Sequence, residues 1–464
     1  MVGRRALLLA GAALPVSAYA QCVTNTPAVD ACRGGMRVTS VAVPVPSLAL
    51  DFTVPGTLPP NVVFTRASVG TYFDSTGTMQ SATTNTPRWD YDPSTLALRG
   101  VLIEEARTNS VKNSTMVGAV AGSPGTDPTG GWSFSQAATG LTRQIAGVGV
   151  ENGIAYIDVR YTAPSTAAGN VIIGFTTSGV AGVPAAAAQQ WMLSYNITLS
   201  AGALPPNTGA LFRCNQFDSG GTLLGTLNTN GALPIVQPLG RSRVVSNFAV
   251  TVANTAFLAP FWLFAVAASA SPVDFTVRIG APQFELGTFA TSFIPTTAAA
   301  VTRAGEAVTM PVAAWFSAAA SSLLAEYMLP QSPNPSPNVR DVVCLSDNTI
   351  SNRMALRGQG QGATASQPSL LTSVAGTTTS SPGLGTSAAF VVQKIAGAWD
   401  GTNAVGAFNG GAAVSYAVGM ASGITQLQFG NDTTASATFL DGWLRRASYW
   451  NTALSNAQLQ AVTT

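Results

Sequence analysis

The chain has 464 residues, enough for two to four domains that each bury a core. Only 9% of the residues are charged, and 46 glycines and 28 prolines favour many strands and turns over long helices. The 22 basic residues nearly balance 20 acidic ones and never form a run longer than two, which argues against a nucleic-acid-binding face. There is no histidine, so the usual Ser-His-Asp and Cys-His systems and most zinc sites are excluded.

Residues 1–20 have the layout of a secretory signal peptide, with two arginines, an apolar run and Ala18-Tyr19-Ala20 before Gln21. An N-terminal arm that is never cleaved is the alternative. Residues 21–45 read as a linker without clear periodicity. If the chain is exported, Cys22 and Cys32 could form a small loop disulfide.

Residues 46–115 are predicted to form a small β-rich module with a hairpin turn at DSTG in TYFDSTGTM. Residues 116–296 carry apolar runs separated by Gly, Pro and Asn, the spacing of a β-sandwich or jelly roll. No residue from 244 to 272 is charged, but Asn254 and Pro260 interrupt the stretch, so we predict core strands and no membrane span. Cys214 and Cys344 lie far apart and are expected to be buried single thiols.

Residues 297–464 are again strand-like. Asp400-Gly401 and Asn409-Gly410 are tight-turn dipeptides between such runs and predict successive hairpins. At the end of the chain, Ser455 and Gln458 have the spacing of a capping box that begins a short helix. The sequence therefore predicts an all-β protein of tandem antiparallel β-sandwiches with a short C-terminal helix.

Four stretches carry a family resemblance: FTRASVGTYFDSTG, PRWDYDPSTLALRGVLIEEARTN, APQFELGTFATSFIPT and DGWLRRASYWNTALSNAQLQAV. Together they resemble virion proteins of tailed phages and prophages, in patches from about 50 to 464. The resemblance implies a carbohydrate-binding-module-like jelly roll followed by a concanavalin A-like or laminin-G-like sandwich. It also implies a tail fibre or spike that binds host cell-surface polysaccharide, contacts other virion proteins and forms a homo-oligomer such as a trimer. The location implied is a virion or an extracellular surface, whereas the signal-like N-terminus leaves secretion open.

Glycan recognition needs flat apolar faces for sugar C–H groups and polar groups for hydroxyls. Trp89, Asp90 and Tyr91 are candidates in PRWDYDPS. If this segment is extended, Trp89 and Tyr91 share one face and Asp90 and Asp92 the other. A turn closed by Asp92-Pro93, with Trp89 in the core, is the favoured alternative.

Trp399, Asp400 and Asn409 are a second candidate group, because they lie near a predicted hairpin whose loops could contact a ligand. The alternative places Trp399 in the core and leaves Asp400 as a turn residue.

The last candidates are Trp443 and Trp450. Strand alternation predicts that Trp443 and Tyr449 share one face and that Trp450 lies on the other, so at least one aromatic ring should face outward.

The sequence favours a binding protein over an enzyme. Glu104 and Glu105 are adjacent, point to opposite faces of a strand and cannot form a glycosidase pair together. Glu326 in LLAEYML could be catalytic, so a secreted polysaccharide-degrading enzyme is one alternative and an exported surface adhesin another. No cofactor or metal is predicted; calcium in a sandwich loop stays open, with Asp432 as a candidate.

Overall fold

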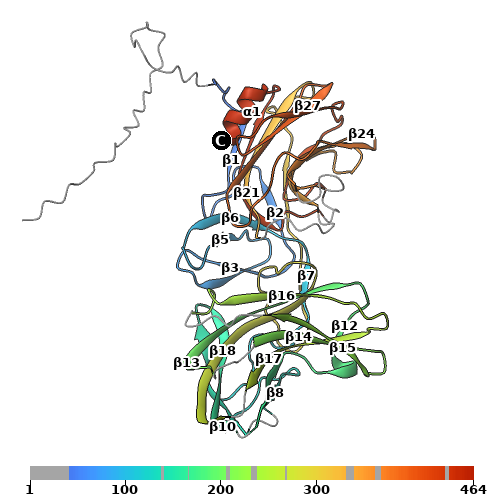
Figure 1. Cartoon of the computed structure of the whole chain (residues 1–464). Coiled ribbons are helices and arrows are strands. Elements are labelled where there is room, and N and C mark those ends of the chain that lie inside the picture. The colour runs from blue at the N-terminus through green and yellow to red at the C-terminus, as the bar shows by residue number, and fades with distance from the viewer. Residues whose placement is uncertain are drawn as a thin grey trace, which may run out of the picture. The chain divides into compact units, whose positions relative to one another are not determined.

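The computed structural model describes residues 41–136, 140–165, 167–204, 210–230, 238–266, 269–330, 339–360, 367–433 and 438–464. Within these ranges every pair of named strands is antiparallel, and the α-helix found is short and C-terminal (Figure 1). The predicted all-β fold of tandem antiparallel sandwiches is confirmed. The signal-like segment, Cys22 and Cys32 lie outside the described residues.

The first sandwich consists of two sheets that enclose one aromatic-rich core. One sheet has the order β16 (Arg243–Ala249), β13 (Gln190–Gly202), β18 (Ser269–Leu286), β10 (Ile154–Ser165) and β9 (Thr142–Glu151). The other has the order β15 (Leu223–Asn230), β14 (Ala210–Phe217), β17 (Phe257–Val266), β11 (Gly169–Gly174) and β8 (Ser133–Ser135), with β12 (Val183–Pro184) beside β17. A short 3-10 turn, η1 (Gly179–Ala181), precedes β12.

Strand β18 shows why the sequence forms this sandwich. Phe275, Val277 and Ile279 alternate with polar residues, and all three are fully buried in the core. On the opposite face, Arg278 donates to Asp158 of β10, with Nη2 2.8 Å from Oδ2. The uncharged stretch 244–272 lies in β16, β17 and the start of β18, as predicted. No described helix has the length and apolar character needed to span a bilayer.

The second sandwich is also built from two sheets around one core. Its first sheet has the order β28 (Val414–Ala417), β27 (Asn403–Phe408), β26 (Gln393–Trp399), β21 (Ser321–Met328), β30 (Gly442–Trp450), β6 (Leu98–Ile103) and β5 (Trp89–Tyr91), and β1 (Leu48–Asp51) also pairs with β30. Its second sheet has the order β2 (Val63–Thr65), β20 (Ala307–Pro311), β29 (Gln426–Phe429), β22 (Arg340–Ser346), β23 (Arg353–Gln359), β24 (Ser369–Val374) and β25 (Thr377–Ser380).

Strands from the N-terminal part thus complete sheets made mainly by the C-terminal part. A small module buries little core by itself, so the pairing of β1, β2, β5 and β6 with later strands supplies its packing. Two short ladders complete this region: β3 (Gly70–Phe73) with β4 (Met79–Ala82), and β7 (Arg107–Asn109) with β19 (Val301–Arg303). The boundaries of the small module and of the two sandwiches at residues 46, 116 and 297 stay predictions.

Local signals in the sequence produce the predicted turns and the final helix. DSTG joins β3 to β4, Asp400-Gly401 joins β26 to β27, and Asn409-Gly410 follows β27. Helix α1 (Asn456–Thr463) begins with a capping box, in which Ser455 Oγ accepts from Gln458 N at 3.4 Å and Gln458 Oε1 accepts from Ser455 N at 2.9 Å. Cys214 and Cys344 are buried free thiols, as expected.

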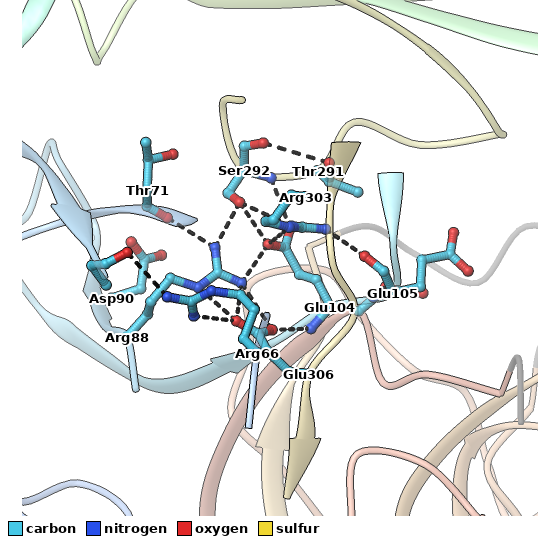
Figure 2. Close-up of polar contacts among 12 residues, drawn as sticks. Arg66, Thr71, Arg88, Asp90, Glu104, Glu105, Thr291, Ser292, Arg303 and Glu306 are labelled. Carbon is cyan, nitrogen blue, oxygen red and sulfur yellow. Dashed lines mark hydrogen bonds and ion pairs between the residues drawn. The ribbon is translucent and has the colours of Figure 1, made fainter. Parts of the chain in front are cut away.

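A buried ionic cluster lies where the N-terminal strands meet the segment between the two sandwiches (Figure 2). It consists of Arg66, Arg88 and Arg303 with Glu104 and Glu306, all at most 5% exposed. Glu306 receives Arg66 Nη1 at 2.9 Å and Arg88 Nη2 at 2.7 Å. Glu104 receives Arg88 Nη2 at 2.8 Å and Arg303 Nη1 at 2.6 Å.

Further hydrogen bonds satisfy many of the donors and acceptors of the cluster that the ion pairs leave free. Arg88 Nη1 donates to Thr71 O at 2.9 Å, and Arg66 Nη2 donates to the carbonyls of residues 82 and 83. Ser292, which follows β18, donates to Glu104 through its backbone N at 2.7 Å and its Oγ at 2.6 Å. Burying charges is tolerable only with such compensation, so the cluster fixes the chain segments that carry these residues in one arrangement.

We predict that Glu306→Gln destabilises the protein by about 3–5 kcal/mol, because two buried guanidinium groups lose their carboxylate. Urea denaturation followed by tryptophan fluorescence measures the loss. The control is Asp274→Asn, which removes one charge from the exposed Arg160–Asp274 pair and should leave the denaturation midpoint unchanged. Equal midpoints for the wild type and Glu306→Gln would contradict a stabilising role of the cluster.

Candidate functional site

A pocket with a volume of about 520 Å³ lies beside the ionic cluster. Its walls come from the N-terminal module at 71–104, from the first sandwich at 192–196 and 240–245, from the segment after β18 at 289–293, and from residues 330, 390, 441 and 443 of the second sandwich. These segments belong to one compact unit, Val41–Thr464. A pocket of this size where several segments converge is the usual form of a small-ligand site.

Asp90 and Trp443 form one wall of the pocket through a contact between the two ends of the chain. The strand order β5–β6–β30 brings them together, and Trp443 Nε1 donates to Asp90 Oδ2 at 2.9 Å. Asp90 also accepts from Phe73 N at 2.7 Å. Burial raises the pKa of Asp90 above its ordinary value, while Arg99 and these two donors oppose the shift.

Arg99 is held between carboxylates and aromatic rings. Its Nη2 lies 2.8 Å from Asp92 Oδ2 and its Nη1 lies 3.6 Å from Asp90 Oδ2. The guanidinium carbon is 4.7 Å from the ring centroid of Trp443 and 5.1 Å from that of Phe390, which is cation–π geometry. Five groups of different polarity thus converge on one side of the pocket.

Phe390 is the exposed aromatic residue at this site. Half of its surface (51%) is accessible, and its backbone has φ 55°, a left-handed conformation that a bulky side chain rarely adopts. A hydrogen bond of 2.8 Å from Phe390 N to Leu329 O holds this conformation. Strained backbone of this kind clusters at functional sites, so Phe390 is a strong candidate for a ligand contact.

The first sandwich contributes Asn196, Arg241 and Arg243 to the pocket. Arg243 Nη2 donates to Ser194 Oγ at 2.8 Å and to Thr291 O at 2.7 Å. Arg241 is exposed, and its Nε donates to Pro93 O at 2.8 Å. Both guanidinium groups therefore have fixed positions at the pocket while keeping further N–H donors.

Two carboxyl groups of the lining have pKa values shifted in opposite directions. Burial raises the pKa of Glu104, but Arg303 and Arg88 outweigh it and lower the pKa to about 2. Burial and the nearby Glu105 raise the pKa of Asp441 to about 8, although Arg340 opposes them. Asp441 Oδ1 accepts from Glu105 N at 2.9 Å. Of these two groups, only Glu104 is fully charged at neutral pH.

The first predicted group, Trp89, Asp90 and Tyr91, does not lie together at the pocket. Asp90 and Asp92 line the pocket, whereas Trp89 packs against the core of the second sandwich and its Nε1 donates to Phe52 O at 3.1 Å. Tyr91 is half-buried and is not part of the pocket lining. Asp92 closes the turn by accepting from the backbone N–H groups of residues 94 and 95, as the alternative prediction had it.

The second predicted group does not gather at the pocket. Trp399 is fully buried and donates to Thr372 Oγ1 at 2.8 Å. Asp400 is an exposed turn residue whose carboxylate accepts from the backbone N–H groups of Thr402 and Asn403. Asn409, exposed in the turn after β27, accepts from the backbone N–H of Lys394. None of the predicted residues of this group lines the pocket.

The prediction that Trp443 and Tyr449 share a face is wrong. A register shift opposite Glu326, at Arg445, inserts an extra residue into β30. Tyr449 therefore points into the core of the second sandwich, while Trp443 lies on the other face with Leu102 and Met328. Trp450 is buried away from the pocket, packs near α1 and donates to Pro44 O at 2.7 Å.

Neither Glu326 nor Asp432 belongs to the pocket. Glu326 pairs with Arg445 at 2.7 Å and with Arg446 at 3.4 Å. Asp432 is fully buried and forms an ion pair with Arg353. In the part of the chain that the structure describes, no group of three or more Cys, Asp or Glu side chains could hold a metal ion.

Sequence reasoning missed Arg99, Arg241, Arg243 and Phe390. Arg241 and Arg243 stand two residues apart but lie far from Arg99 in the sequence, and Phe390 occurs in the apolar run AAFVVQKI, which predicts a buried strand. The exposed side chains of Phe390, Val391 and Val392 depart from that pattern. Only the antiparallel pairings that assemble the pocket bring these residues together.

No protein-family model matches the chain, and no curated protein sequence matches it. Among solved structures, it is similar to a Ruminococcus gnavus IT-sialidase CBM40, with 13% identity and a TM-score of 0.26 over 32% of this chain and 84% of that one. It is also similar to domain 4 of AbnA, a GH43 extracellular arabinanase from Geobacillus stearothermophilus, with 10% identity and a TM-score of 0.29 over 38% and 82%. The mouse laminin alpha1 chain, domains LG4-5, matches with 9% identity and a TM-score of 0.20 over 59% and 87%. Similarity at this level carries no information about ligand or activity.

We predict that Asp441→Asn removes a loss of stability that the wild type undergoes between about pH 4 and about pH 8. Because the folded-state pKa of Asp441 lies above its ordinary value, the folded protein binds the extra proton and the wild type loses stability as the pH rises from about 4 to about 8. The stability of the variant relative to wild type should rise by up to about 1.4 kcal/mol per pH unit in that window. Urea midpoints from pH 5 to 9 measure it.

The control for this experiment is Asp400→Asn. Backbone hydrogen bonds lower the pKa of Asp400, so its stabilising effect is complete above its ordinary pKa and is lost only in acid. The control should therefore run parallel to wild type from pH 5 to 9. Parallel curves for wild type and Asp441→Asn would contradict the raised pKa of Asp441.

Proposed function

We propose that this protein binds polysaccharide through the pocket at the junction of its two sandwiches. The observation that carries the proposal is the exposed ring of Phe390 beside the Arg99–Asp92 ion pair at a pocket of about 520 Å³. An exposed ring offers a flat face to the C–H groups of a sugar, and the ion pair offers both donors and acceptors to its hydroxyls.

The surroundings of the pocket support a binding role. Trp443 and Asp90 are fixed by hydrogen bonds, and Glu104 is engaged by two arginines and Ser292. Side chains locked in this way give a preformed site, which loses little conformational entropy when a ligand binds. The near-neutral net charge is compatible with glycan ligands of weak charge.

The finer proposal is a receptor-binding component, fibre or spike, of a phage or prophage particle. Its support is the sequence resemblance, and all four resembling stretches contain residues of the pocket or of the ionic cluster, including Arg66, Arg88, Glu104, Ser292 and Trp443. Display of several copies as a homo-oligomer on a virion or cell surface, beside other virion proteins, would convert weak contacts with a host polysaccharide into strong attachment.

We expect Phe390→Ala to weaken polysaccharide binding by about 2- to 10-fold, the worth of one aromatic contact. The purified full chain is applied to an array of bacterial surface polysaccharides, and the affinity for each bound glycan is then measured by calorimetry. Ile350→Ala is the matched control, because Ile350 is also an exposed apolar residue and lies outside the pocket lining. Absence of binding to every polysaccharide, or equal losses in both variants, would reject the pocket as a glycan site.

Two further measurements separate the alternatives. Release of reducing ends from a bound polysaccharide, abolished by Asp441→Asn, would make the protein a polysaccharide-degrading enzyme. An intact Met1 on purified particles supports virion assembly, whereas a mature protein that begins at Gln21 indicates an exported surface adhesin.

A further inference from the structure

Two of the three arginines that line the pocket form no ion pair with a carboxylate. Arg99 is paired with Asp92 and lies near Asp90. By contrast, no ion pair within 4.0 Å joins Arg241 or Arg243 to a carboxylate of the residues that the structure describes. Their fixed contacts are to Pro93 O, Ser194 Oγ and Thr291 O, which are neutral acceptors.

The acidic residues of the lining are engaged elsewhere: Asp92 is paired with Arg99, and Asp90 lies near the same arginine. Glu104 is engaged by Arg88 and Arg303 of the ionic cluster, which itself has three arginines against two glutamates. The shifted pKa of Asp441 leaves that carboxyl largely protonated at neutral pH. Glu285, Glu104 and Asp90 act on Arg243 only through longer-range attraction, so Arg241 and Arg243 keep N–H groups that an anion in the pocket could engage.

We infer that the pocket recognises the carboxylate of an acidic sugar residue, held by Arg241 and Arg243 while the sugar ring lies against Phe390. The guanidinium fork matches the geometry of a carboxylate and binds it through paired N–H groups. The aromatic ring at the same pocket selects an anion that carries an apolar face, as a sugar acid does and a small inorganic anion does not. This inference rests on the proposed function and names the ligand class of the same site.

The test uses the full chain and matched pairs of polysaccharides. Alginate and polysialic acid serve as acidic probes, their carboxyl-reduced derivatives as neutral probes of the same backbone, and dextran as an unrelated neutral glycan. Affinity is measured by calorimetry at low and at physiological salt. We expect at least about tenfold tighter binding to one acidic probe than to its reduced form, with a difference that shrinks as salt rises.

Variants assign the effect to the pocket. Arg243→Gln and Arg241→Gln should each lower the affinity for the acidic probe about tenfold, with no change in any affinity for the reduced probe. Arg160→Gln is the control, because it removes the same charge from an exposed pair with Asp274 outside the pocket lining. Equal far-UV circular dichroism of all variants shows that folding is intact, and exposed Arg241 provides an independent variant if Arg243→Gln does not fold.

The outcomes separate the two proposals. Equal binding of acidic and carboxyl-reduced glycans would overturn the carboxylate inference and leave the polysaccharide function standing. Binding of neutral bacterial glycans alone on the array would do the same. Binding of no glycan at all would overturn both, and tight binding of inorganic sulfate with no glycan binding would identify a simple anion site instead.

Discussion

The buried cluster of three arginines and two glutamates is the interaction on which the rest of this structure depends. It joins four parts of the chain: Arg66 directly after β2, Arg88 directly before β5, Glu104 directly after β6, and the segment of Arg303 and Glu306 that enters the second sandwich. Buried charges are stable only when every partner is present, so the cluster tolerates one relative placement of these segments. The pocket lies against this fixed junction and shares Glu104 and Ser292 with it.

The same dependence explains what the resembling stretches of the sequence do. FTRASVG supplies Arg66, PRWDYD supplies Arg88 and Asp90, LIEEARTN supplies Glu104, and ATSFIPT supplies Ser292. Each of these side chains has an ion pair or hydrogen bond with a partner from another segment, and that geometry restricts which residues can replace it. The core strands between them need only apolar residues of suitable size, a requirement that many sequences meet.

Local physics made much of the fold predictable. Period-two alternation, as at Phe275, Val277 and Ile279, identifies strands, and the Asp400-Gly401 dipeptide identifies a turn. Long-range pairing was beyond such signals. The sequence near Leu48 does not indicate that β1 pairs with β30 at the other end of the chain. The sequence GWLRRASYW likewise does not indicate the bulge that places Trp443 and Tyr449 on opposite faces of the sheet. Of the predicted site residues, only Asp90 and Trp443 line the pocket. The other pocket side chains come together only through long-range strand pairing, which the sequence does not indicate.

The pocket draws its walls from both sandwiches, and this has a mechanical consequence. A ligand that contacts Arg243 on one side and Phe390 on the other bridges two sandwiches that the chain links twice, between β6 and β8 and again between β18 and β20. Pulling the sandwiches apart would then break ligand contacts together with the ionic junction. The force needed to detach a bound ligand would therefore depend on how firmly the ionic cluster holds the two sandwiches together.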